Sequence, residues 1–118
     1  MDDCKLSDKK CTPCTGKTPR FTQAEIDAYL PLVPEWRYYV NDAGDKIQKT
    51  FSFTNFITAM VFINKMADVA ENQEHPHHPD FRLYNYRHVE VSLTTHAIRG
   101  LSENDFILAA KIDIIVMA

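Results

Sequence analysis

Several features that would place this chain in a special class are missing from its 118 residues. No stretch approaches the roughly 18 apolar residues of a membrane-spanning helix. Basic residues are not in excess, because the formal net charge is -3, whereas a nucleic-acid-binding surface is usually basic. Residues 1–10 are charged and polar and lack the apolar core of a secretory signal. We therefore expect a soluble cytoplasmic protein with neither a membrane nor a nucleic acid as partner.

Cysteine is also scarce, and all of it lies at one end. Cys4, Cys11 and Cys14 fall within the first fourteen residues. Cys11-Thr-Pro-Cys14 has the CxxC spacing of redox and zinc sites, but no apolar strand precedes it and Cys4 alone could add a nearby ligand. A reduced tail, a disulfide and an incidental metal site all remain open. Residues 1–20, rich in Lys, Asp, Thr and Pro, predict a flexible N-terminal arm.

Residues 21–118 have the length and the periodic patterns of one domain. Thr22 and Glu25 have capping-box spacing at the start of a short helix that Pro31 would end. Alternating apolar residues then predict two strands, 36–40 and 46–53, joined by an Asn-Asp-Ala-Gly turn.

A long helix is predicted from a cap at Thr54 or Asn55 to about residue 72. Its apolar stripe is wide, which indicates burial on more than one side, for example against a second subunit. The apolar residues of the stripe are Phe56, Ile57, Met60, Val61, Phe62, Ile63, Ala67 and Ala70.

Two further strands, 82–86 and 88–96, and a last helix, 103–114, complete the predicted domain. In the second strand one face is apolar, with Val89, Val91 and Leu93, and the other is polar. The last helix would bury Phe106, Ile107, Ala110 and Ile114. The order α-β-β-α-β-β-α predicts an α+β fold, with helices packed on one face of a four-stranded antiparallel sheet.

Candidate chemistry lies in a histidine-rich segment. His77 and His78 stand between Pro76 and Pro79, which prevent a continuous helix. Adjacent side chains of an extended chain point to opposite sides, so these two histidines would perform different tasks. The cluster His75-x-His77-His78 could instead bind zinc or copper, or consist of solvated loop histidines.

His96 is the expected partner of this segment, because it would close the last strand on its polar face. His88 shares that face but lies eight residues away, on the order of 27 Å along a strand, so we exclude it from the site. Two histidines on opposite sides of a ring could add and remove the two protons of a dehydration without a metal. Asp105 could orient one imidazole, or it could be the acid of a capping box that begins at Ser102.

Several motifs between residues 11 and 113 together resemble the pterin-4a-carbinolamine dehydratase family, bacterial type. Three motifs are specific when they occur together. They are His-His-Pro, a later Thr-His on a predicted strand, and the segment Asn104 to Ala110. The matching segments are Cys11 to Cys14, Trp36, Asn55 to Asn64, Ala70-Glu71, His77-His78-Pro79-Asp80, Thr95-His96, Gly100-Leu101 and Asn104 to Ala110.

The resemblance implies a hydro-lyase that converts 4a-hydroxytetrahydropterin to quinonoid dihydropterin and water, after an aromatic amino acid hydroxylase has used the reduced pterin. It implies no metal or other cofactor. It places the family's catalytic set on His77, His78, His96 and Asp105. His77 and His96 would transfer protons, and His78 would position the pterin. The residues expected to line the pterin site with the three histidines are Pro79, Phe81, Thr95, Ala97 and Ile98.

This chain departs from the family pattern by two extra residues between Ala70-Glu71 and the histidine pair. Either Glu71 or Glu74 could therefore join the site. Family members commonly form homodimers or homotetramers, which the wide helix stripe fits. Some relatives act as partner proteins, so a non-catalytic assembly or dimerisation factor on the same fold is the alternative function.

Overall fold

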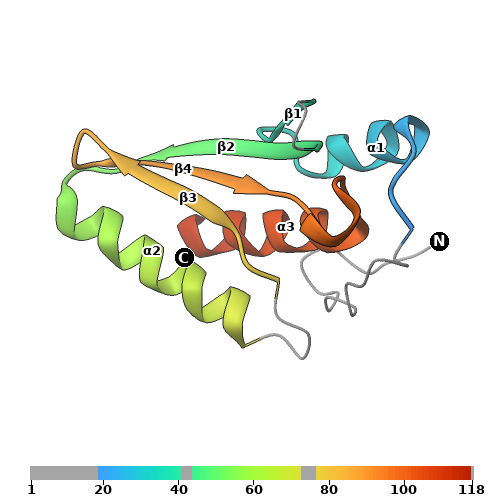
Figure 1. The fold of residues 1–118 in the computed structure, drawn as a ribbon. Coiled ribbons are helices and arrows are strands. Elements are labelled where there is room, and N and C mark those ends of the chain that lie inside the picture. Colours follow the sequence, from blue (N-terminus) through green and yellow to red (C-terminus); the bar gives the residue numbers. More distant parts are fainter. Residues whose placement is uncertain (1–18, 41–43, 73–76, 118) are drawn as a thin grey trace.

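The computed structural model describes residues 19–40, 44–72 and 77–117 (Figure 1). Its elements are α1 (Gln23–Tyr29), the 3-10 helix η2 (Leu30–Leu32), β1 (Arg37–Tyr39), β2 (Lys46–Ser52), α2 (Phe56–Glu71), β3 (Asp80–Tyr84), β4 (His88–Leu93), the 3-10 helix η3 (His96–Ile98) and α3 (Glu103–Met117). The strands form one antiparallel sheet in the order β1-β2-β4-β3. Helices α2 and α3 lie along the same face of that sheet (Figure 1), so the predicted α+β fold and element order are confirmed. Within the described residues, no helix has both the length and the apolar character needed to cross a membrane.

The predicted starts of α1 and α2 are confirmed by side-chain caps. The Thr22 hydroxyl accepts a hydrogen bond from the Glu25 backbone N–H, and the Glu25 carboxylate accepts one from the Thr22 N–H at 2.9 Å. The Asn55 side chain accepts one from the Thr58 N–H at 2.8 Å. These side chains satisfy amide groups that a helix cannot pair within itself, which fixes where each helix begins.

Helix α2 buries one face and leaves a second apolar face in solvent. The buried residues are Ala59, Phe62, Ile63, Met66 and Ala70. Phe56, Ile57 and Val61 are each about half exposed or more. The predicted apolar stripe therefore included residues of two faces, one buried and one exposed, because apolar residues surround most of this helix. Helix α3 differs from the prediction near its C-terminal end. Phe106 and Ile107 are buried as predicted, but Ile114 is exposed.

The predicted ends of the two later strands were wrong. Strand β3 spans Asp80–Tyr84 rather than 82–86, because Asn85 and Tyr86 adopt left-handed backbone angles that turn the chain. Strand β4 ends at Leu93 rather than at His96. Beyond it, Thr95 pairs with Gly100 and closes a loop that contains η3. His96 is therefore in a loop at the end of the sheet and not on its polar face.

The inner face of the sheet packs on the helices. One charged side chain, that of Lys49, lies on this face and extends to a helix. Val89, Val91 and Leu93 are fully buried there, as predicted. Lys49 of β2 reaches α3, where its Nζ lies 2.8 Å from Asp113 Oδ1. The indole N–H of Trp36 donates to the same carboxylate at 3.1 Å. Asp113 thus joins the start of β1, the centre of β2 and the last helix.

Met66 lies on the buried face of α2, in the hydrophobic core, with 1% of its surface exposed. We predict that Met66→Ala lowers the free energy of unfolding by about 2–5 kcal/mol, because it leaves a cavity in a packed core. Chemical denaturation measures the change. Lys65→Ala, on the exposed side of the same helix, should stay within about 0.5 kcal/mol of the unmodified chain. Equal effects of the two substitutions would contradict this packing.

Candidate active site

The buried carboxylate of Asp105 is the centre of the candidate site. Asp105 has no exposed surface, and three donors surround its two oxygens. His77 Nε2 lies 2.6 Å from Oδ1. The Thr95 hydroxyl and the Ser102 backbone N–H donate to Oδ2 at 2.9 and 3.0 Å. A carboxylate removed from water is costly unless it is hydrogen-bonded, and these three donors supply that compensation.

Asp105 has both of the roles that its sequence position allowed. As the third residue of α3 it accepts from the Ser102 N–H, which is one half of a capping box. The Ser102 hydroxyl does not complete that box, because it bonds Thr95 Oγ1 at 2.8 Å. A negative charge is also favourable in the first turn of a helix. One carboxylate oxygen therefore fixes the helix start, and the other holds the His77 ring.

The hydrogen bonds determine where the protons lie in this network. An ionised carboxylate can only accept, so His77 donates from Nε2 and a neutral His77 carries its proton there. Thr95 has one hydroxyl proton and gives it to Asp105. Ser102 must then donate to Thr95. The ordered chain Ser102 to Thr95 to Asp105 holds in place the carboxylate that His77 Nε2 contacts.

His78 points elsewhere, as expected for neighbouring residues of an extended segment. Its Nε2 lies 2.8 Å from Glu71 Oε1, and both side chains are mostly exposed. They line one pocket of about 340 Å³ together with Pro79 and Phe81. The C-terminal half of α2 supplies the other residues of that pocket, Met66, Ala67, Asp68 and Ala70. Of the two acids expected near the site, Glu71 is beside His78, and Glu74 lies outside the described residues.

His96 approaches the same segment from the η3 loop. Its Nε2 lies 3.6 Å from Asp80 Oδ2, and both side chains are more than two-thirds exposed. Residues 77–80 are therefore contacted from three separate elements: Asp105 holds His77, Glu71 holds His78, and His96 lies beside Asp80. Sequence reasoning missed Asp80 and Ser102 as members of this arrangement. The position of Asp80 directly after the His-His-Pro motif was the available signal.

The remaining predicted residues divide between the surface and the interior. Ala97 is exposed and Ile98 is half-buried in η3. Thr95 is buried, with 1% of its surface exposed, and its hydroxyl donates to Asp105, so Thr95 supports the site through that carboxylate. His88, which we excluded, pairs with Ser52 at 2.8 Å at the far end of β4.

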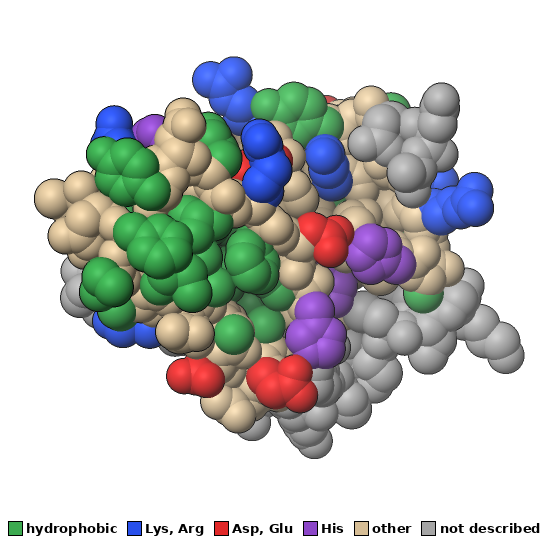
Figure 2. All heavy atoms as spheres, turned by 60° about the vertical axis from the view of Figure 1, so that its left-hand side comes forward, with side chains coloured by type: hydrophobic (Ala, Val, Ile, Leu, Met, Phe, Trp, Pro, Cys, Tyr) green, Lys and Arg blue, Asp and Glu red, His purple; other side chains and the backbone are tan. Residues whose placement is uncertain are grey.

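Histidine and acidic side chains gather on one face of the molecule, at the border of a broad hydrophobic surface (Figure 2). The part of the chain that the structure describes contains no group of three or more His, Cys, Asp or Glu residues able to hold a metal ion. His75, Pro76 and the three cysteines lie outside the described residues. The alternative of a metal cluster at His75-x-His77-His78 is therefore not tested.

Comparison with known proteins identifies the family of the chain. The family model for pterin 4 alpha carbinolamine dehydratase matches residues 19–115. The chain belongs to the pterin 4 alpha carbinolamine dehydratase family. A Methylococcus capsulatus protein, named provisionally for that activity, is 42% identical over 96% of this chain and 95% of its own length. A Halorhodospira halophila protein with the same provisional name is 44% identical over 92% of this chain and 94% of its own.

Solved structures extend the dehydratase family comparison to three dimensions. A Brucella melitensis protein, described as a transcriptional coactivator/pterin dehydratase, has a TM-score of 0.72 and 32% identity. The match covers 82% of this chain and 98% of the Brucella chain. A pterin dehydratase-like protein described as a RuBisCO assembly factor in the alpha-carboxysome has a TM-score of 0.56 over 69% of this chain and 88% of its own. At 22% identity it shows the shared fold alone.

Thr95 offers a direct test of the hydrogen-bond chain. We predict that Thr95→Val lowers the free energy of unfolding by about 1–3 kcal/mol, because a buried carboxylate loses a donor. Thr95→Ser, which keeps the hydroxyl, should recover most of that loss. Denaturant unfolding measures both variants. The ring ¹⁵N shifts of His77 should report a proton on Nε2 in the unmodified chain, and a proton on Nδ1 alone would contradict the assigned network.

Proposed function

We propose that this protein dehydrates 4a-hydroxytetrahydropterin to quinonoid dihydropterin and water by histidine acid-base catalysis, within tetrahydropterin recycling. In this reaction the C4a–O bond breaks as one group protonates the departing hydroxyl. A second group removes the proton from the adjacent ring nitrogen as a C=N bond forms. Histidine is suited to both steps, because its ordinary pKa lies near neutral pH.

The observation that carries this proposal is the 2.6 Å contact between His77 and the fully buried Asp105. A carboxylate that orients an imidazole and stabilises its protonated form is a recurring support for a histidine that exchanges protons. Structural needs alone would not require an ionisable pair here, because apolar residues of similar volume are often equally stable at buried positions.

The pocket beside His78, in which apolar residues outnumber polar ones, supports a planar substrate that has polar groups on one side. Its volume of about 340 Å³ falls within the range of small-molecule sites. Phe81, half exposed, offers a ring face on which a pterin could stack. The Glu71 carboxylate and His78 provide polar contacts at the same wall. We assign the holding of the pterin to His78, and the proton transfers to His77 and His96.

His96 is the residue whose removal tests this assignment best. We predict that His96→Ala lowers kcat/KM for chemically generated carbinolamine by about 100-fold or more, the usual contribution of a general acid or base. Being mostly exposed, His96 can be removed without loss of the fold, which circular dichroism can check. His88→Ala is the matched control and should retain normal turnover. Near-normal activity of His96→Ala would remove His96 from the mechanism.

Added metal distinguishes acid-base catalysis from the alternative of a metal site. We predict that the purified protein still accelerates dehydration after treatment with EDTA, because the proposed steps need only protein side chains. Stopped-flow measurement of carbinolamine loss, with and without added zinc, checks this. A rate that requires zinc would overturn the mechanism, and a rate equal to the uncatalysed one would overturn the enzymatic function itself.

The exposed apolar face of α2 supports assembly as a homodimer or homotetramer. Phe56, Ile57 and Val61 are 48%, 70% and 47% exposed, and contiguous apolar surface of this kind marks interaction sites. We predict that Val61→Glu shifts the protein to a smaller species in sedimentation analysis, because the interface would bury a charge. Ala24→Glu, on the exposed side of α1, should leave the assembly unchanged. An unaltered mass of the Val61→Glu variant would place the interface elsewhere.

The same apolar face favours the second candidate function, a non-catalytic assembly or dimerisation factor. One structural relative is described as a transcriptional coactivator/pterin dehydratase, and another as a RuBisCO assembly factor. The buried His77–Asp105 pair favours catalysis, since docking of a partner on α2 does not use it. Normal folding and assembly combined with absent dehydratase activity would support the factor instead.

A further inference from the structure

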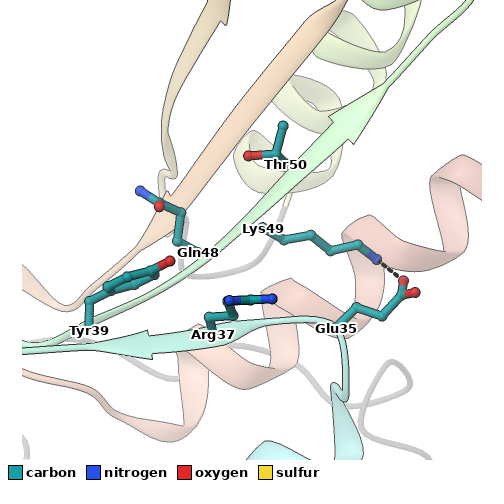
Figure 3. A pocket seen from close by; sticks show the side chains of 6 residues that line it. All are labelled: Glu35, Arg37, Tyr39, Gln48, Lys49 and Thr50. Atoms are coloured by element: carbon teal, nitrogen blue, oxygen red, sulfur yellow. Dashed lines mark ion pairs between the residues drawn. The ribbon is translucent and has the colours of Figure 1, made fainter.

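A second pocket lies at the β1 edge of the sheet, and the proposed dehydration does not use it. Its volume is about 380 Å³, similar to that of the pocket beside His78. Strand β1 pairs with only the first three residues of β2, and β2 continues to Ser52. The lining residues come from the segment before β1, from β1 itself and from β2 (Figure 3): Glu35, Arg37, Tyr39, Gln48, Lys49 and Thr50.

Lys49 forms the inner wall of this pocket as a fixed positive charge. Its side chain is 15% exposed, and Nζ is held between Asp113 at 2.8 Å and Glu35 at 2.9 Å. Burial alone would lower the pKa of Lys49, but hydrogen bonds and charge attraction from Asp113 and Glu35 outweigh it and raise the pKa. The ammonium group therefore stays charged at neutral pH.

Arg37 adds a second positive charge to the same pocket. Its side chain extends in the same direction as Lys49, toward Glu35 (Figure 3), and the described residues include no ion-pair partner for it. Lys46 stands close by, with Nζ 6.0 Å from the Tyr39 ring centroid. The lining thus contains two cationic side chains and one carboxylate, in a chain whose net charge is -3.

We propose that this pocket binds the oxyanion group of a small molecule, a carboxylate or a phosphate, between Arg37 and Lys49. A guanidinium presents paired donors that match the oxygens of either group. Gln48, Thr50 and the Tyr39 hydroxyl provide neutral hydrogen-bonding groups for the rest of the ligand. The polar lining suits a hydrophilic ligand rather than an aromatic ring buried on both faces.

In the unliganded protein, Glu35 occupies the position of the ligand's oxyanion. The Glu35 side chain is 76% exposed, so solvent screens its attraction to Lys49 and Glu35 contributes little stability. Displacing it costs little, whereas Asp113 on the inner side, 25% exposed, continues to hold Lys49. Glu35 is thus an internal competitor, and its removal should strengthen binding.

Nuclear magnetic resonance titration of the full chain tests this proposal, with inorganic phosphate and malonate as separate probes and sodium chloride at equal ionic strength as the reference. We expect saturable amide shifts at the lining residues with at least one probe. Arg37→Gln should weaken that binding about tenfold or more, the loss expected for a charge-assisted hydrogen bond. Glu35→Gln should tighten it severalfold.

Arg82→Gln is the matched control, because Arg82 is another exposed arginine, on the opposite edge strand and paired with Glu90 at 3.3 Å. Its affinity for either probe should equal that of the unmodified chain. Saturation by phosphate alone or by malonate alone identifies which oxyanion the pocket prefers. Shifts that match those in chloride, equal affinity in Arg37→Gln, or no gain in Glu35→Gln would each overturn the proposal.

Discussion

The burial of one carboxylate, that of Asp105, constrains much of this structure. Asp105 must be compensated on both oxygens, and its three donors come from three separate segments: His77 in the segment before β3, the loop after β4 and the start of α3. Satisfying that charge therefore brings together parts of the chain that are far apart in sequence. The same contacts hold the His77 ring in place, which is the preorganisation that the proposed acid-base catalysis requires.

Much of the fold follows from local patterns in the sequence. The capping box at Thr22 and the cap at Asn55 fixed two helix starts correctly, and the alternation of Val89, Val91 and Leu93 identified the buried sheet face. Strand ends were harder to predict. Nothing in the alternation shows that Asn85 and Tyr86 adopt left-handed angles or that Thr95 pairs with Gly100, because these features depend on tertiary contacts.

The candidate site shows the same division between local and long-range information. Resemblance to the family selected His77, His78, His96 and Asp105, and the structure joins His77 directly to Asp105. The structure was needed to place Ser102 and Asp80 in the site. From sequence alone, a serine before a helix is interpreted as a cap. Sequence reasoning also did not predict the polar pocket around Arg37 and Lys49. Lys49 occupies an inward-facing position in the alternation of β2, and its charge is paired there with Asp113, which is distant in sequence.

The central claim is that buried Asp105 acts through His77 to support dehydration. The most direct measurement is kcat/KM for carbinolamine dehydration by Asp105→Asn across neutral pH, with circular dichroism to establish that the variant is folded. The account predicts a folded protein whose kcat/KM falls by about 100-fold or more, since an amide cannot stabilise the protonated imidazole. A folded Asp105→Asn variant with the pH profile and turnover of the unmodified protein would contradict it.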